Sequence, residues 1–369
     1  MILHEFEVKR ILEEYGIPTE QAVLVSEADV GRFEELISHL KPPYVVKAQV
    51  RGWGRGRMGL VRTAGTPSEA KSHALQILGA TFRGERVKHV MVSEKLRVVR
   101  ELYLSMMVGG SPPGVLLLAS SAGGIEVEEA VGGVLMLRVD PHTGLRSYHV
   151  RRVAKQLNTP ESAIEPILRG MYKALWDYSL TLLELNPLAE TEQGLVAVDR
   201  KAIADTDSGN PRLAEFISRY EEELGPLQLE AKRWGFAAVK LEGDVAVVGN
   251  GAGLTLATLD AVAEAGGRPG LFLDLGGGAA AERVRAALKL VLSEPGIRKV
   301  LVNIVGGITR CDEVAKGVVE ALREAGGEGV KLAVRLTGFM EEEGRRILSE
   351  AGVKAFGSLE GAVGEVVGP

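Results

Sequence analysis

The chain has a single cysteine, Cys311, among its 369 residues, and it lacks long apolar runs. One cysteine cannot form a disulfide within the chain, which fits a reducing cytoplasm. No apolar run approaches the roughly 20 residues that a membrane-spanning helix needs, and no basic segment followed by an apolar run marks a signal peptide at the start. The net charge of −5 gives no sign of the basic surface that nucleic acids or anionic membranes select.

Histidine is also scarce and unevenly distributed. The six histidines lie at positions 4, 39, 73, 89, 142 and 149, so residues 150–369 contain none. The C-terminal part of the chain therefore has no histidine that could carry a phosphoryl group. Cys311 is a weak candidate for a nucleophile, because a free cysteine is more often a small buried apolar residue.

The two parts of the chain have different patterns. Residues 205–235 are polar and interrupted by glycine and proline, so we place a domain boundary near 226–240 and expect domains at 1–235 and 236–369. Beyond it, short apolar segments are each followed by glycine and a helical pattern, which predicts βα units in a parallel sheet. Because these segments do not alternate with polar residues, both faces of that sheet should be covered. The segments are 245–249, 271–275, 300–305 and 332–336.

Lys47 lies in an apolar strand and is followed by a loop rich in glycine and arginine, residues 51–59. Glycines leave backbone N–H groups accessible, and arginines add positive charge, so this loop can fold over phosphates. Its G-x-G-x-x-G at 54–59 does not open a helix, since another strand follows at 60–63, and we reject a dinucleotide fingerprint. The alternative for Lys47 is an edge-strand lysine in water.

Glu184 and Asn186 are two residues apart on a predicted strand and therefore share a face. Asp199 ends the strand expected to pair with it across a turn at 190–194. Oxygen ligands in this number suit Mg²⁺, which keeps several waters and bridges to substrate phosphates. The alternative is a capped turn with a surface carboxylate.

Three glycine-rich turns follow strands of the C-terminal part. Asn250 begins one of them, and the others occupy residues 274–278 and 303–309. Ligands of α/β sheets bind where the strands end, and the amides at a helix start favour anions. Tight turns also need glycine for conformational reasons alone, but three at one sheet edge favour an anion site.

The motifs, in chain order, resemble those of succinyl-CoA synthetase (succinate–CoA ligase) β subunits. The resemblance implies an α/β chain with an N-terminal ATP-grasp region of two lobes, the inserted one at roughly 20–100. It also implies a C-terminal, flavodoxin-like CoA-ligase domain with a doubly wound parallel sheet. The motifs are LHEF (3–6), YGIP (15–18), VKAQV (46–50), GRG (54–56), ELYL (101–104), ELNP (184–187), GNGAGL (249–254), FLDLGGGA (272–279) and VNIVGGITRCD (302–312).

The same resemblance implies a role for individual residues. Glu184 would be the catalytic glutamate that steadies the phosphohistidine at the nucleotide, and Asn186 and Asp199 would be the Mg²⁺ ligands. Glu20 lies near the position where relatives distinguish the base, and its carboxylate could accept from guanine or adenine. The expected nucleotide-binding residues are Lys47, Gly54, Arg55, Gly56, Glu94, Leu96 and Glu101, and the expected acid-substrate contacts are Asn250, Gly307, Ile308 and Thr309.

The family reaction converts succinyl-CoA, NDP and phosphate into succinate, CoA and NTP, with ATP/ADP or GTP/GDP as the nucleotide. It belongs to the tricarboxylic acid cycle and passes through a phosphohistidine on a CoA-binding α subunit. We therefore expect such a partner, Mg²⁺ as cofactor, and a cytoplasmic enzyme. The alternatives are a malate–CoA ligase β subunit, a stand-alone ATP-grasp carboxylate–amine ligase, and a non-catalytic nucleotide-binding protein.

Overall fold

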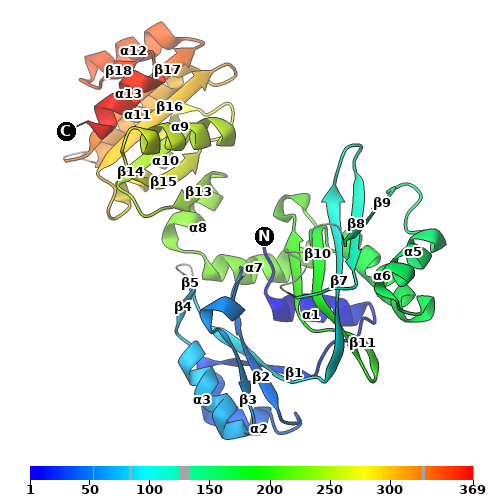
Figure 1. Ribbon diagram of the computed structural model, residues 1–369. Coiled ribbons are helices and arrows are strands. Elements are labelled where there is room, and N and C mark those ends of the chain that lie inside the picture. Colours follow the sequence, from blue (N-terminus) through cyan, green and yellow to red (C-terminus); the bar gives the residue numbers. More distant parts are fainter. Residues whose placement is uncertain (53, 83–84, 125–132, 326–328, 369) are drawn as a thin grey trace. The chain divides into compact units, whose positions relative to one another are not determined.

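The computed structural model describes residues 1–52, 54–82, 85–124, 133–325 and 329–368 (Figure 1). The chain forms two compact units, Met1–Arg219 and Tyr220–Pro369, and the first of them contains a four-stranded sheet, a six-stranded sheet and a two-stranded hairpin. None of the helices in these ranges is long and apolar enough to cross a bilayer.

The smaller lobe of the first unit is a four-stranded antiparallel sheet. Val46 and Ala48 of its β2 strand join the core under helix α3, so Lys47 between them points to the opposite face. The lobe also has the helical segments η1 (Glu27–Arg32) and α2 (Phe33–Leu36) and the hairpin β4 (Thr81–Phe82) and β5 (Glu85–Arg86). The sheet order is β1 (Ala22–Ser26), β6 (His89–Glu94), β2 (Tyr44–Gln49) and β3 (Val61–Ala64), and α3 spans Pro67–Ile77.

The larger lobe is an antiparallel sheet packed against helices α1 (Glu5–Glu14), α5 (Ser147–Leu157) and α6 (Glu161–Asp177). Leu183 and Leu185 belong to this core, so Glu184 between them lies on the other face of the sheet. The sequence patterns assign no element to residues 147–177, where the structure has α5 and α6. The strands run in the order β11 (Gly194–Ala197), β10 (Leu180–Thr191), β7 (Val98–Gly109), β8 (Gly114–Ser120) and β9 (Leu135–Val139), and β12 (Arg200–Ala204) also pairs with β10. Two short turns, η3 (Thr206–Ser208) and η4 (Pro211–Leu213), lead into α7 (Ala214–Glu223).

The second unit is built on a six-stranded sheet that is parallel except for β13, which is antiparallel to β15. Counted along the chain, its five parallel strands lie in the order second, first, third, fourth, fifth, which is the flavodoxin-like order. The predicted doubly wound parallel sheet is confirmed. The sheet order is β13 (Ala237–Lys240), β15 (Pro269–Asp274), β14 (Val245–Gly249), β16 (Lys299–Gly306), β17 (Lys331–Gly338) and β18 (Ala355–Phe356).

Helices cover both faces of this sheet, as the unbroken apolar strands require. All five residues of β14 are buried: Val245 and Val247 face one core, and Ala246 and Val248 face the other. Helices α9 (Ala252–Glu264) and α13 (Leu359–Val367) contribute to the first core. The second core is formed with α8 (Pro226–Arg233), α10 (Ala281–Ser293), α11 (Cys311–Ala325) and α12 (Glu341–Glu350).

Candidate active site

Lys47 and Arg55, the two cations expected to hold nucleotide phosphates, both contact the carboxylate of Glu5. Lys47 Nζ lies 2.8 Å from Glu5 Oε1, and Arg55 Nη1 lies 2.8 Å from Glu5 Oε2. The Glu5 side chain is 1% exposed, and each of the two cations is 9% exposed. Lys47 also donates to the carbonyl oxygen of Val198 at 2.9 Å. The structure therefore brings together two of the predicted site residues, through an acid for which the sequence patterns predicted no role.

Three further charged residues extend this group. Arg55 Nη2 contacts Asp199 Oδ1 at 3.1 Å, and Arg200 Nη2 contacts Glu5 Oε1 at 3.3 Å. Arg200 also pairs with Glu20, so the Glu20 carboxylate faces an arginine within the fold. We call these six residues the ionic cluster; they are Glu5, Glu20, Lys47, Arg55, Asp199 and Arg200.

The two buried acids of the ionic cluster have opposite pKa shifts. Burial disfavours the charged form of Glu5, but the charges of Lys47, Arg55 and Arg200 outweigh it and hold the pKa of Glu5 well below its usual value. Burial is the dominant influence on Glu20 and raises its pKa, although Arg200 opposes the shift. Glu5 is thus the anion on which the cations of the cluster converge.

The glycine-rich loop lies between two paired strands, as predicted. Lys47 of β2 pairs with Val61 of β3, and the loop between them contains a short 3₁₀ turn, η2 (Gly56–Met58). Gly54 has a φ of 91°, a left-handed conformation that glycine adopts without strain. No α-helix begins at residues 54–59, and strand β3 follows, which agrees with the rejection of a dinucleotide fingerprint.

The three residues predicted to lie near the base have different surroundings. Glu94 ends β6, and its carboxylate accepts a hydrogen bond from the Lys41 backbone at 2.8 Å. Leu96 is half-buried in the connection to β7. Glu101 is an exposed residue of β7. No contact among the described residues joins these three side chains, so their roles stay predictions.

Glu184 is held from both sides on the face of the larger sheet that the helices do not cover. Tyr103 of β7 donates its hydroxyl to Glu184 Oε2 at 3.2 Å, and Lys201 Nζ donates to Oε1 at 3.1 Å. Lys201 is the β12 residue directly opposite Glu184 in the strand pairing. Burial and the neighbouring Glu184 charge raise the pKa of Tyr103 to about 12, so its hydroxyl remains a donor at neutral pH.

Asn186 and Asp199, the predicted Mg²⁺ ligands, are brought together by their backbones. The N–H of Asn186 donates to the carbonyl oxygen of Asp199 at 2.9 Å. Asp199 follows β11 and precedes β12, so it does not end the paired strand as predicted. Asn186 Oδ1 accepts from the Gly124 N–H at 2.6 Å, and the Asp199 side chain is 36% exposed. Two hard oxygen donors fit Mg²⁺ that keeps waters and phosphates as its other ligands. Within the described ranges, no cluster of three or more His, Cys, Asp or Glu residues suits a metal.

In the second unit, side-chain hydrogen bonds tie together the turns at the carboxyl edge of the sheet. Asn250 donates to the Val305 carbonyl at 2.9 Å and accepts from the Val305 N–H at 3.0 Å. Its amide also lies 3.3 Å from Thr309 Oγ1, which accepts from the Gly278 N–H at 3.0 Å. Asn250 and Thr309 follow β14 and β16, between which the strand order reverses, the usual ligand position in such folds. Gly307 is exposed and Ile308 is 90% exposed, so both are accessible beside Thr309.

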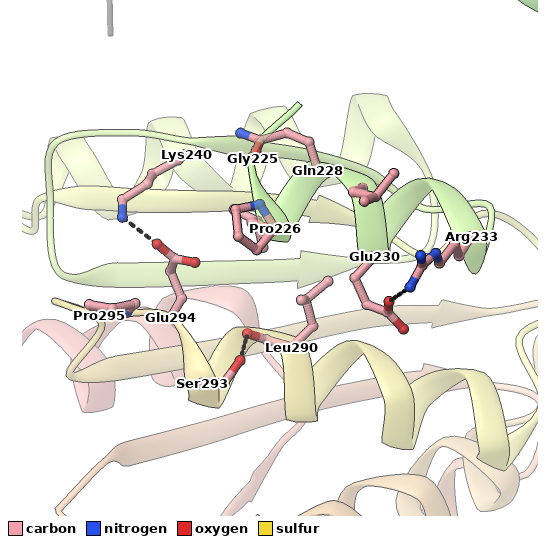
Figure 2. A pocket seen from close by; sticks show the side chains of 12 residues that line it. Gly225, Pro226, Gln228, Glu230, Arg233, Lys240, Leu290, Ser293, Glu294 and Pro295 are labelled. Atoms are coloured by element: carbon pink, nitrogen blue, oxygen red, sulfur yellow. Dashed lines mark hydrogen bonds and ion pairs between the residues drawn. The ribbon is translucent and has the colours of Figure 1, made fainter. Parts of the chain in front are cut away.

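A separate hollow of about 680 Å³ lies between the start of α8 and the end of α10 in the second unit. Figure 2 shows that its charged residues already pair with one another, Lys240 with Glu294 and Arg233 with Glu230. None of the predicted site residues lines it, and it adds nothing to the candidate site.

Comparisons with known proteins identify the domains and the family of the chain. A sequence model of the ATP-grasp domain matches residues 2–190, and one of the CoA-ligase domain matches residues 248–365. The solved ATP citrate lyase of Methanothrix soehngenii, in complex with citrate and coenzyme A, has a TM-score of 0.71 at 21% identity, covering 96% of this chain and 95% of that chain. This likeness shows a shared fold.

Curated relatives match over the full length of the chain. The succinate–CoA ligase (ADP-forming) subunit beta of Ignicoccus hospitalis is 41% identical over 100% of this chain and 98% of its own length. The Pyrobaculum aerophilum protein of the same name is 39% identical, with coverage of 100% and 99%, and that of Desulfatibacillum aliphaticivorans is 38% identical, with coverage of 97% and 96%. The chain therefore belongs to the family of succinate–CoA ligase β subunits.

Proposed function

We propose that this chain is the β subunit of an ADP-forming succinate–CoA ligase. The enzyme would interconvert succinyl-CoA, ADP and phosphate with succinate, CoA and ATP. The observation that carries the proposal is the presence of two separate anion-ready sites in a chain that matches named β subunits over its full length. In one site Lys47 and Arg55 meet at Glu5 and Arg55 contacts Asp199, and in the other Asn250 contacts Thr309.

The first site would bind the nucleotide and transfer its terminal phosphoryl group. Lys47 and Arg55 would neutralise charge that accumulates on the phosphoryl oxygens, which is the main catalytic contribution in such transfers. Asn186 and Asp199 would hold Mg²⁺, which supplies further positive charge at the phosphates. Glu184 would accept a hydrogen bond from the imidazole that receives the phosphoryl group. We also propose that Glu94, Glu101 and the backbone near Leu96 contact the nucleoside.

The imidazole and the CoA site would belong to a partner α subunit. The second unit has no histidine, so it cannot itself supply the phosphohistidine of the family reaction, which supports a histidine on the partner. The Asn250 and Thr309 side chains, with exposed Gly307 and Ile308, would meet succinate or its acyl phosphate together with that partner. The single cysteine fits a reducing cytoplasm, where we propose that the complex acts.

The direct test is co-expression of the full chain with a phosphohistidine-bearing, CoA-binding α subunit of this ligase class. The complex should form a CoA thioester from succinate with ATP and Mg²⁺, and each chain alone should not. Asp199→Asn keeps the size of the side chain but removes the charge, and it should abolish Mg²⁺-dependent turnover. Activity of the lone chain would refute the proposed dependence on a partner.

The same assay with different substrates tests which carboxylic acid and which nucleotide the enzyme uses. Succinate and malate are compared at equal concentrations, as are ATP and GTP. If a thioester forms with malate but not with succinate, malate is the substrate. If turnover occurs with GTP but not with ATP, the enzyme is GDP-forming rather than ADP-forming. The two results are independent, because the acid and the nucleotide are bound by residues of different units.

A further inference from the structure

Glu5 is a charged residue of the phosphate site that the proposed chemistry does not use. It is the first residue of helix α1, whereas Lys47 and Arg55 come from β2 and the loop after it. Both of its oxygens are engaged, at 2.8 Å from each of these cations. Glu5 belongs to the LHEF motif, so this motif contributes a carboxylate to the phosphate site and not packing contacts alone.

The ionic cluster contains equal numbers of acidic and basic side chains. Three acids, Glu5, Glu20 and Asp199, face three cations, Lys47, Arg55 and Arg200. Buried cations without a counter-ion are strongly unfavourable, so a carboxylate in this position stabilises the empty site. A carboxylate oxygen and a phosphate oxygen also select the same donors at the same distances. Glu5 therefore competes with any phosphate that approaches Lys47 and Arg55.

We propose that Glu5 is a resident counter-ion of the phosphate-binding cations. It is a positioning residue that keeps Lys47 and Arg55 directed at the site, and its charge lowers their affinity for nucleotide phosphates. The inference rests on the proposed nucleotide site and adds a determinant of how tightly ADP and ATP are held. Weaker binding of both nucleotides favours release of the product in either direction of the reaction.

The test compares Glu5→Gln with a matched control, Glu20→Gln. Both substitutions replace one buried carboxyl group of the ionic cluster by an amide, but among the described residues the Glu20 side chain pairs with Arg200 rather than with Lys47 or Arg55. Both variants of the full chain should melt at a lower temperature than wild type when no ligand is present. Only Glu5→Gln should then bind ADP more tightly, on the order of tenfold, because one repelling charge near the phosphates has been removed.

Titration calorimetry with ADP, with and without Mg²⁺, measures the dissociation constant, and thermal melting with added pyrophosphate measures the ligand-induced shift. The expected result is a larger shift and a lower dissociation constant for Glu5→Gln, with Glu20→Gln within about twofold of wild type. Equal behaviour of the two variants, or weaker ADP binding by Glu5→Gln, would overturn the inference and leave Glu5 a purely structural residue.

A second variant covers the case in which Glu5→Gln does not fold. Glu5→Asp keeps the charge but withdraws it from the two cations by one methylene, so ADP should bind a few-fold more tightly than to wild type. Unchanged or weaker binding would contradict the inference. If wild type itself shows no binding of ADP, the proposed nucleotide site fails, which is a separate outcome from failure of the role of Glu5.

Discussion

Replacing Tyr103 by phenylalanine removes one hydroxyl from Glu184 and keeps the ring. The lost hydrogen bond has an O–O distance of 3.2 Å, slightly long for a hydroxyl donor. Bonds to charged groups contribute about 1.5–3 kcal/mol, so we take the lower end. If that amount is lost only when Glu184 must hold the imidazole, phosphoryl transfer slows about tenfold.

The assay separates the two half-reactions. In the proposed function, phosphorylation of the partner's histidine by ATP would use the Glu184 site, whereas consumption of the phosphohistidine with succinate and CoA would use the second unit. Tyr103→Phe should slow the first about tenfold and leave the second unchanged. Because the pKa of Tyr103 is about 12, its hydroxyl stays protonated at pH 7–9 and the defect should be constant there.

Lys201→Met provides the companion variant, since it removes the other partner of the same carboxylate. Two residues that act through one group are not additive, so the double variant should be less impaired than the product of the single effects. A wild-type rate of histidine phosphorylation in Tyr103→Phe would refute the positioning role. An equal loss in both half-reactions would point instead to a general disturbance of the fold.

Three further outcomes follow from the structure. Asn250→Ala loses hydrogen bonds to Val305 and Thr309, so the KM for succinate should rise about tenfold while histidine phosphorylation by ATP persists. If succinate use and histidine phosphorylation were both lost, the proposal that the two units bind different substrates would be contradicted. Leu104→Ala empties a fully buried position of the larger lobe and should lower the free energy of urea unfolding by about 2–5 kcal/mol, with a loss below 1 kcal/mol refuting its place in the core. Chelation of Mg²⁺ should weaken ADP binding to wild type but not to Asp199→Asn, and an equal effect on both would exclude Asp199 as a ligand.

Much of the second unit could be predicted from its sequence because the signals there are local. Apolar strands followed by glycine and a helix predicted βα units, and β14, with all residues buried, is such a strand. The sequence placed the turns after these strands at one sheet edge, and the hydrogen bond from Asn250 to Thr309, in the turn after β16, agrees with that placement.

The charge partners of the first unit could not be predicted because they are far apart in sequence. Glu5 and Lys47 are separated by 42 residues, and Arg200 and Glu20 by 180. No periodicity connects such pairs; only the packing of α1 against the two sheets brings them together. Lys201 could have been noticed in the sequence because it lies two residues after Asp199. Its pairing with Glu184, however, depends on the register of β12 and β10.

The hydrogen bonds that join Asn250, Val305, Thr309 and Gly278 fix three loops before any ligand arrives. Ordering a free residue on binding costs about 1–2 kcal/mol of backbone entropy, and these loops have already lost that freedom during folding. An acid that fits this edge should therefore bind with little backbone movement. Discrimination between acids of similar size should then depend on the fixed positions of these three loops. A ligand with one misplaced oxygen should bind poorly, because the loops do not adjust to it.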